Sequence, residues 1–300
     1  MEPDLTHNSP SGILAPMVIT GTTSGIGAAL ALQLAKEGRD LILVNRSRSR
    51  TQATLDAIEQ SGSQATIHVV EADLSTTKAI RSAAAQISQL TPHLSVLFNN
   101  AGVLLGDLAY ASSGNDMHYQ VNTVAPYLLA QLLKPQLQAA AEASNGPGPA
   151  GQAVIVNTNS GGVDFAGSLR VGELRQPSKF RKLVGPYAQS KLALLTLSQI
   201  IAPELEKAGI LIRDAEPGPT KTVMTAGSGM PKLLVYVRNL FFRTASAGAQ
   251  NVYDSAFHKS LGAKTAVFTD KGGKLRKLPP SVVDPEIQKR MQELIMEDLA

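Results

Sequence analysis

Residues 20–27 read Thr-Gly-Thr-Thr-Ser-Gly-Ile-Gly, and this stretch decides the fold. It follows a short apolar run at 15–20, which predicts a buried strand. It leads into residues 24–38, whose apolar side chains recur at a spacing of four and predict a helix. Gly21 permits a sharp exit from the strand, Gly25 lets a pyrophosphate approach the backbone, and Gly27 allows close helix packing. The helix N-terminus would favour that anion, although a plain structural turn can carry the same glycines.

The same alternation of elements continues along the chain. Further strands are predicted by apolar runs at 41–44, 66–70, 94–98, 153–156, 210–212 and 266–268. Helices are predicted between them at 51–61, 78–90, 117–143 and 187–208, and in two pieces around 243–244 within 222–263. Strands that are apolar throughout and separated by helices are typical of a parallel sheet covered on both faces. We therefore predict an α/β fold with a doubly wound, Rossmann-type, mostly parallel seven-stranded sheet.

Length and composition fit a single domain with a terminal extension. The chain has 300 residues, of which 43% are hydrophobic, and it shows neither an internal repeat nor a linker. We expect a disordered N-terminus at 1–14 and a NAD(P)-binding Rossmann-type catalytic domain at 15–270. A C-terminal extension at 271–300 would pack on that domain through a helix that starts at Asp284-Pro285-Glu286.

The composition excludes several classes of function. Cysteine is absent, which rules out disulfides and thiolate nucleophiles, and the five histidines show no metal-ligand spacing. We therefore expect no metal, and we place His118 on a helix surface. The formal charge of +4 is mild and forms no basic block, so no nucleic-acid partner is predicted. Without a signal-peptide pattern or a long apolar stretch, we expect a cytoplasmic protein that has no membrane span.

The end of the second predicted strand bears on the choice of dinucleotide. An NAD site usually places a carboxylate there, whereas this chain has Asn45 and Arg46 followed by Ser47 and Arg48. Arg46 can form charge-assisted hydrogen bonds to a 2′-phosphate, with Arg48 as a candidate assistant. A solvated basic loop is the alternative, and it suits Arg48 and Arg50 better than Arg46. We therefore predict NADP(H) as the cofactor.

Tyr187 and Lys191 lie four residues apart, so their side chains share one face of the predicted helix. A tyrosine hydroxyl has a usual pKa of about 10, which makes it a poor proton-transfer group near neutral pH. A neighbouring ammonium lowers that pKa towards the working range. Such a pair also occurs often by chance, so its meaning depends on the rest of the chain.

Together these features resemble the short-chain dehydrogenase/reductase family over nearly the whole length. The motifs that carry the resemblance are the glycine-rich turn, Asp73-Leu74, Asn99-Asn100-Ala101-Gly102, Asn122, Ser160, Tyr187-x-x-x-Lys191, and Pro217-Gly218 followed by Thr222. Leu278-Pro279-Pro280 before the last helix is similar to the retinol-dehydrogenase-like branch. The chain departs from the pattern at Asn159, where the family often has serine, and at Gly161-Gly162, which predict an unusually flexible substrate loop.

The resemblance implies a role for each catalytic candidate. Ser160 would hydrogen-bond the substrate oxygen, Tyr187 would give or take its proton, and Lys191 would bind the nicotinamide ribose and tune Tyr187. Asn122 would hold a water that passes protons onward from Lys191. Alternatives stay open, since Asn122 could instead be buried and bonded to backbone, and Thr158 could replace Ser160 if the loop register is off by two.

The implied cofactor contacts cover the carboxyl ends of the strands, with Asp73 bonding the adenine unless it caps the next helix instead. They are Gly21, Thr23, Ser24, Gly25, Ile26, Gly27, Asn45, Arg46, Asp73, Leu74, Asn100, Ala101, Gly102, Tyr187, Lys191, Pro217, Gly218, Thr220 and Thr222.

Loops at 161–184 and 219–243 are expected to cover the substrate, with the C-terminal segment as a third candidate. Their apolar side chains are Val163, Phe165, Leu169, Phe180, Val223, Met224, Met230, Leu233, Leu234 and Tyr236. We predict an NADP(H)-dependent oxidoreductase that interconverts a carbonyl and an alcohol on a hydrophobic or aromatic small molecule. The alternatives are a catalytically silent NADP(H)-binding sensor or scaffold, and an enone (C=C) reductase. The resemblance implies a homodimer through the helices at 117–143 and 187–208, unless the C-terminal helix covers that surface.

Overall fold

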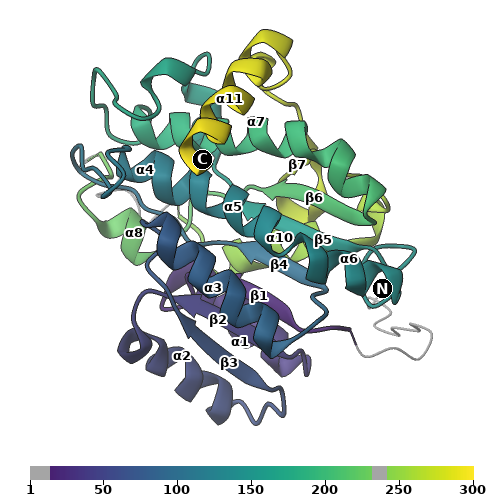
Figure 1. Cartoon of the computed structure of the whole chain (residues 1–300). Helices are drawn as coiled ribbons and strands as arrows, with labels where there is room; N and C mark the ends of the chain where they lie inside the picture. Colours follow the sequence, from purple (N-terminus) through teal and green to yellow (C-terminus); the bar gives the residue numbers. More distant parts are fainter. Residues whose placement is uncertain (1–13, 232–241) are drawn as a thin grey trace.

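The computed structural model describes residues 14–231 and 242–300, and these form an α/β sandwich around one sheet (Figure 1). The strand order is β3-β2-β1-β4-β5-β6-β7-β8, parallel except for β8. The strands are β1 (Met17–Thr20), β2 (Leu41–Asn45), β3 (Ile67–Glu71), β4 (Val96–Asn99), β5 (Ala153–Thr158), β6 (Ile210–Ala215), β7 (Val267–Thr269) and β8 (Leu275–Arg276). The doubly wound, mostly parallel sheet is confirmed. The count of seven strands was wrong, because two-residue β8 has no apolar run to mark it.

Helices cover both faces of the sheet, and each face has its own apolar core. On one face lie α1 (Gly25–Lys36), α2 (Arg48–Gln60) and α10 (Ala245–Phe257). On the other lie α3 (Thr77–Leu90), α5 (Ala125–Leu132), α6 (Lys134–Glu142) and α7 (Pro186–Lys207). Successive strand residues alternate between the two cores, as a pleated strand requires: Ile212 faces α7, whereas Leu211 faces α10.

The segment predicted as one helix at 117–143 is three helices with a wider turn between the first two. It comprises α4 (Met117–Tyr119), a π-helical turn at Gln120–Val124, and then α5 and α6. The chain breaks at Leu133, whereas Pro126 lies in the first turn of α5. Pro135 fits a helix start here, because it lies in the first turn of α6, where its missing N–H group has no intrahelical partner to lose. The π-helical turn contains Asn122.

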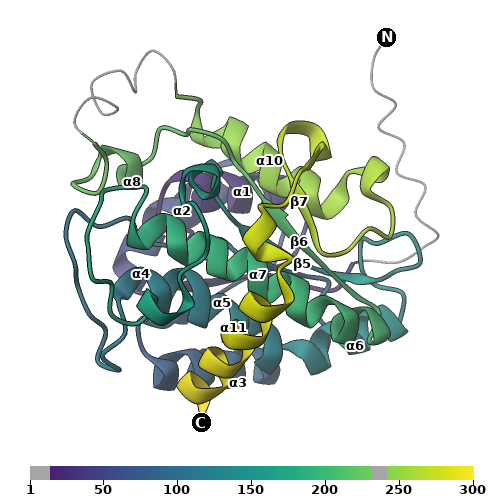
Figure 2. The ribbon, with the colours of Figure 1, turned by 90° about the horizontal axis from the view of Figure 1, so that it is seen from above.

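The C-terminal helix α11 (Pro285–Leu299) packs against α7, and it starts where the sequence predicts. The carboxylate of Asp284 accepts hydrogen bonds from the first turn of α11, and Met291 and Ile295 are buried in a cluster with α7 residues. Figure 2 shows α11 lying across α7. It therefore covers part of the surface through which a homodimer was predicted.

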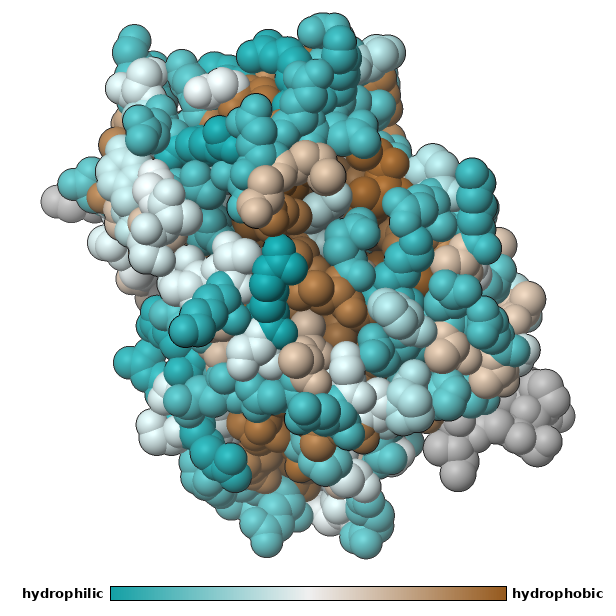
Figure 3. Space-filling model, viewed as in Figure 1, coloured by the Kyte–Doolittle hydropathy of each residue, from teal (hydrophilic) through white to brown (hydrophobic). Residues whose placement is uncertain are grey.

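The remaining helices are short, and they surround the ends of the strands. They are α8 (Val223–Ala226) and the 3₁₀ turns Gly161–Phe165, Val171–Glu173, Lys259–Leu261, Lys271–Gly273 and Pro280–Val282. Figure 3 shows that one face is mostly hydrophilic, with apolar side chains gathered near its centre. Among the described residues, no helix combines the length and hydropathy needed to cross a bilayer. Of the predicted tail at 1–14, residues 1–13 lie outside the described residues, and the cellular compartment stays a prediction.

Candidate active site

A cavity of about 960 Å³ lies over the carboxyl ends of the strands, where the topology switches between β1 and β4. Its wall contains every predicted cofactor contact, together with Ser160. Asn122 is the one predicted site residue that the wall leaves out. Residues from seven separate parts of the sequence therefore meet in one place.

The glycine-rich turn forms one end of this cavity. Gly21 and Gly25 have φ values of +73° and +61°, which side chains disfavour. A Cβ at Gly27 would collide with the carbonyl of Gly21 and the amide of Asn100, inside the 3.0 Å that real Cβ contacts respect. Ser24 makes no side-chain cap for α1, so the first N–H groups of that helix are open to a ligand. This cradle fits a pyrophosphate.

Asn45 fixes this turn to β2 with its side chain. It is buried, and its Oδ1 accepts a hydrogen bond from the backbone N of Thr22 at 2.7 Å. Its Nδ2 donates to the hydroxyls of Thr22 at 2.7 Å and Thr51 at 3.0 Å. Asn45 therefore shapes the cavity wall, and its side-chain amide is already engaged within the protein.

Arg46 is exposed at the rim of the cavity, and Arg50 joins it there, whereas Arg48 does not line the cavity. The backbone N of Arg48 instead donates to the Glu71 carboxylate at 2.8 Å. The prediction had placed Arg50 in a solvated loop, because it started the helix at 51. Ser47 is the actual N-cap, so Arg50 belongs to the first turn of α2.

Asp73 is exposed at the edge of the cavity, between the buried residues Ala72 and Leu74. Its Oδ1 accepts a hydrogen bond from the backbone N of Ser75 at 3.0 Å. The cap of α3 is Thr76 rather than Asp73. The capping alternative for Asp73 was therefore wrong.

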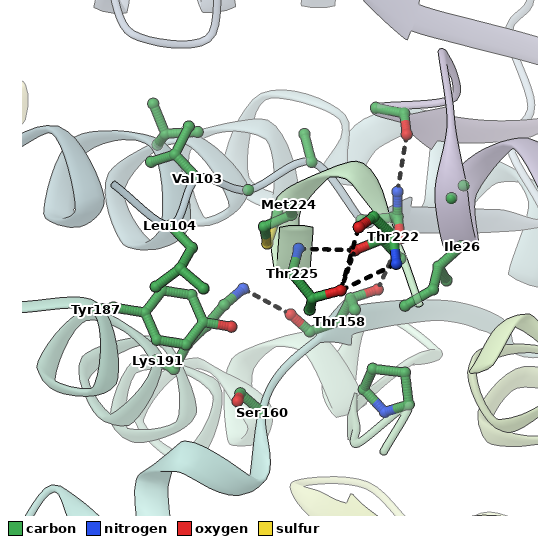
Figure 4. A pocket seen from close by; sticks show the side chains of 18 of the residues that line it. Ile26, Val103, Leu104, Thr158, Ser160, Tyr187, Lys191, Thr222, Met224 and Thr225 are labelled. Atoms are coloured by element: carbon green, nitrogen blue, oxygen red, sulfur yellow. Dashed lines mark hydrogen bonds between the residues drawn. The ribbon is translucent and has the colours of Figure 1, made fainter. Parts of the chain in front are cut away.

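Tyr187 and Lys191 lie on the first turns of α7, both buried, and both face the cavity (Figure 4). Burial raises the pKa of Tyr187, and a hydrogen bond with the Ser160 hydroxyl partly opposes this. Lys191 Nζ donates to the carbonyl oxygen of Thr158 at 2.7 Å. Burial lowers the pKa of Lys191 to about 8, against the attraction of Asp214. The expected lowering of the Tyr187 pKa by Lys191 is not met here, because burial dominates.

The buried side chain of Asn122 forms hydrogen bonds with other groups of the protein. This agrees with the alternative that placed Asn122 in a buried, backbone-bonded position. Its Oδ1 accepts from the backbone N of Val103 at 2.8 Å, and its Nδ2 donates to the Val103 carbonyl at 3.0 Å and to Ser190 Oγ at 3.1 Å. These bonds hold the strand-end segment that carries Gly102 against α7. The predicted water relay from Lys191 stays a prediction.

The substrate loop is held by close contacts at its two glycines. Ser160 Oγ accepts from the backbone N of Gly162 at 3.1 Å. A Cβ at Gly161 would collide with the carboxylate of Glu216. The small residues allow close packing at this point, and the expectation of an unusually flexible loop stays a prediction. Thr158 directs its hydroxyl to Asn100 Oδ1 at 3.5 Å, away from Tyr187.

An apolar wall surrounds the Tyr187 ring. It is formed by Leu104, Leu183, Met224, Met230 and Phe242. Sequence reasoning found the two methionines but missed Leu104, Leu183 and Phe242, which come from three separate loops.

The remaining predicted lid residues divide between the cavity and the core. Phe165 lines the cavity and is 74% exposed. Val163, which lies in the 3₁₀ turn, and Leu169, which follows it, are instead buried in a cluster with α7 residues. Leu233, Leu234 and Tyr236 lie outside the described residues.

His118 is buried, so its predicted surface position was wrong. Its Nε2 accepts a hydrogen bond from the backbone N of Leu105 at 3.0 Å, and its Nδ1 faces Asp116 Oδ1 at 3.2 Å. The ring meets the edge of the Tyr187 ring at 6.3 Å between centroids. His118 therefore supports the floor of the catalytic region. Within residues 14–231 and 242–300, no cluster of histidine and acidic side chains could hold a metal ion.

Comparisons with known proteins agree with this geometry. The family profile described as short chain dehydrogenase matches residues 16–169. The chain belongs to this family.

Individual relatives of this short-chain dehydrogenase include retinol dehydrogenase 11 of Homo sapiens, which is 29% identical over 82% of this chain and 73% of that protein. The carbonyl reductase Sniffer of D. melanogaster has 26% identity and a TM-score of 0.62, over 87% of this chain and 98% of that one. A short-chain dehydrogenase from Sphingobium yanoikuyae, solved in complex with NADPH, has 25% identity and a TM-score of 0.59, over 78% and 82%. The protein is therefore an oxidoreductase of the class that acts on CH–OH and C=O groups with a nicotinamide cofactor.

Proposed function

We propose that this short-chain dehydrogenase uses NADP(H) to interconvert a carbonyl and an alcohol on a hydrophobic or aromatic substrate. The observation that carries the proposal is the position of the Tyr187 hydroxyl. It lies buried between an apolar wall and the glycine-rich cradle, on the same side of the cavity as Ser160 (Figure 4). A proton donor at that junction meets both an apolar substrate and a dinucleotide.

The chain offers a place for each part of the cofactor. The open N-terminus of α1 would bind the pyrophosphate, and Asp73 and Leu74 would hold the adenine. Arg46 and Arg50 at the rim, with no carboxylate at the end of β2, support a 2′-phosphate and hence NADP(H). The nicotinamide would supply the hydride.

Tyr187 would supply the proton. In the reducing direction the substrate carbon gains the hydride and its oxygen gains the phenolic proton, which leaves a phenolate. Burial raises the pKa of Tyr187, so the proton is in place at neutral pH. The Ser160 hydroxyl holds the reacting oxygen beside the phenol, and the Lys191 ammonium stabilises the phenolate that forms.

The substrate would lie against Leu104, Met230 and Phe242, with Phe165 at the entrance. Such a wall favours apolar and aromatic aldehydes, ketones or alcohols, because it removes apolar surface from water. The relatives named retinol dehydrogenase and carbonyl reductase support this class of substrate.

Replacing Tyr187 by Phe tests the proposal. We expect turnover of aromatic and long-chain carbonyls with NADPH to fall by at least about a hundredfold, with NADPH affinity unchanged. Tyr253→Phe is the matched control, because it removes a hydroxyl that bonds only Glu37 far from the cavity. A Tyr187→Phe protein that keeps full turnover would refute the proton-transfer role.

The substrate panel separates the remaining alternatives. Wild-type protein that binds NADPH and reduces no member of the panel would indicate a sensor or scaffold. Reduction of 2-cyclohexenone at its double bond, with cyclohexanone untouched, would indicate an enone reductase. A clear preference for small polyols would contradict the apolar substrate class.

A further inference from the structure

Asp214 is a buried carboxyl group that none of the proposed catalytic steps uses. It lies on β6, is 0% exposed, and does not line the cavity. It shares the strand face of Ile210 and Ile212, and therefore points towards α7.

A chain of hydrogen bonds connects Asp214 to the catalytic residues. Asp214 Oδ1 accepts from Asn159 Nδ2 at 2.9 Å. The same amide group donates to the backbone carbonyl of Lys191 at 3.2 Å, and Asn159 Oδ1 accepts from the backbone N of Ser160 at 2.9 Å. One carboxyl group thus ties β6 to the end of β5 and to α7.

The charges around Asp214 single out Lys191 as its electrostatic partner. Burial raises the pKa of Asp214 to about 7, against the opposing effects of Asn159, Ser198 and Lys191. On the neighbouring strand β7, Phe268 pairs with Asp214, and Arg276 from β8 stacks on the outer ring face at 4.5 Å.

The other nearby cations are engaged elsewhere. Arg276 forms ion pairs with Glu216 and Asp164. Arg213 lies on the opposite strand face, where it donates to the backbone carbonyls of Ser255 and Lys264.

We propose that Asp214 is a positioning residue, which supports Ser160 through Asn159 and holds Lys191 in its charged form from the side away from the cavity. This inference rests on the proposed function. A buried carboxylate without a full ion pair is costly to the fold. In this protein the carboxyl group that carries this cost is Asp214, which lies behind Tyr187 and Lys191 on the side away from the cavity.

Asp214→Asn removes the charge and keeps the shape and the acceptor for Asn159. Losing a negative charge favours the deprotonated form of every neighbouring group. In carbonyl reduction both Tyr187 and Lys191 act in their protonated forms, so the rate falls as they lose their protons. We therefore expect this falling limb of the pH–rate profile to move to lower pH by on the order of one unit.

Stability gives a second readout. The folded-state pKa of Asp214 lies above its ordinary value, so wild-type stability falls as the pH rises towards 7. Asp214→Asn lacks this loss. Its Tm relative to wild type should therefore be higher by a few degrees at alkaline pH than near pH 5.

The experiment measures pH–rate profiles with NADPH and the panel carbonyl that wild type reduces fastest. It also follows the Lys191 side-chain ¹³Cε signal by NMR, assigned by its loss in Lys191→Arg. Arg213→Lys is the matched control, because it perturbs the same strand on the other face. It should lower Tm and leave the falling limb at its wild-type pH. If Asp214→Asn does not fold, Asp214→Ala removes the same charge with a smaller side chain.

A falling limb and a Lys191 midpoint that both move to lower pH would support the proposal. A uniform loss of activity, with the falling limb and the midpoint at their wild-type pH, would overturn it and leave Asp214 a packing residue. Turnover by Tyr187→Phe would refute the proposed function instead, and the Lys191 midpoint would then still decide whether Asp214 holds its charge.

Discussion

Replacing Arg46 by Ala should weaken NADPH binding and leave NADH binding unchanged. Arg46 lies at the cavity rim beside the end of β2, where the ribose 2′ position of a bound dinucleotide would lie. A hydrogen bond to a charged group contributes about 1.5–3 kcal/mol. Arg46 is exposed, so salt screens it and the lower value applies. That value corresponds to a roughly tenfold increase in the Kd for NADPH.

Fluorescence titration of the protein with each dinucleotide would measure this change. Arg48→Ala is the matched control, because it removes the same charge two residues away from a side chain outside the cavity wall. The effect of Arg46→Ala should shrink as the salt concentration rises, and adding Arg50→Ala should enlarge it. Equal losses in the Arg46 and Arg48 variants, or an equal loss of NADH affinity, would refute the assignment of the 2′-phosphate to Arg46.

Three further outcomes follow from the contacts described. Gly27→Ala should cost about 1–3 kcal/mol of unfolding free energy in urea, because its Cβ meets backbone, whereas Gly172→Ala, with ordinary contacts, should not. Arg175→Met should lower the unfolding free energy by about 1–3 kcal/mol, because it leaves the buried Asp298 carboxylate without its cation. Adding Asp298→Asn removes that unpaired charge, and it should restore part of the lost stability in thermal melts. Burial raises the pKa of Tyr187, so its proton is lost only at alkaline pH. Alcohol oxidation needs the deprotonated form and should accelerate from neutral to alkaline pH, whereas carbonyl reduction should not. An oxidation rate that does not change with pH would contradict this.

The elements of the sheet could be predicted because each has a strong local signal. β1, β2, β4, β5 and β6 are apolar on both faces, and their helices carry apolar stripes. β8 could not be predicted, because two residues in a turn-rich segment carry no periodicity. The break at Leu133 was predictable in principle from Pro135, but the earlier Ala125-Pro126 pair gave the same signal. Pro126 lies in the first turn of α5, where a missing N–H group costs nothing.

The site residues that sequence reasoning found belong to short motifs. Most of these motifs lie at the ends of strands, whereas Tyr187 and Lys191 lie at the start of α7 and Asn122 in the π-helical turn. Those it missed are recognisable only from packing. His118 sits on a helix whose exposed face could not be known before α11 and the loop at 103–105 were placed. Glu216 precedes Pro217-Gly218, but its contact with Gly161 joins two distant loops. Arg50 was assigned to a loop because the predicted helix started at residue 51, three residues after the observed start of α2 at Arg48.

The departures from the family pattern carry more information about this chain than the matches do. Asn159 replaces the usual serine, and its longer amide side chain reaches both Asp214 and the backbone of Lys191. A serine hydroxyl has one donor and a shorter reach, so it could not make both bonds while accepting one from Ser160. Gly161 likewise leaves room for the Glu216 carboxylate, which any side chain would displace. Asn159 thus bonds the buried Asp214, and Gly161 makes room for the half-buried Glu216. Both acids lie near the catalytic residues. Because buried acids are unfavourable for folding, their placement here favours a role in setting the charge around Tyr187 and Lys191.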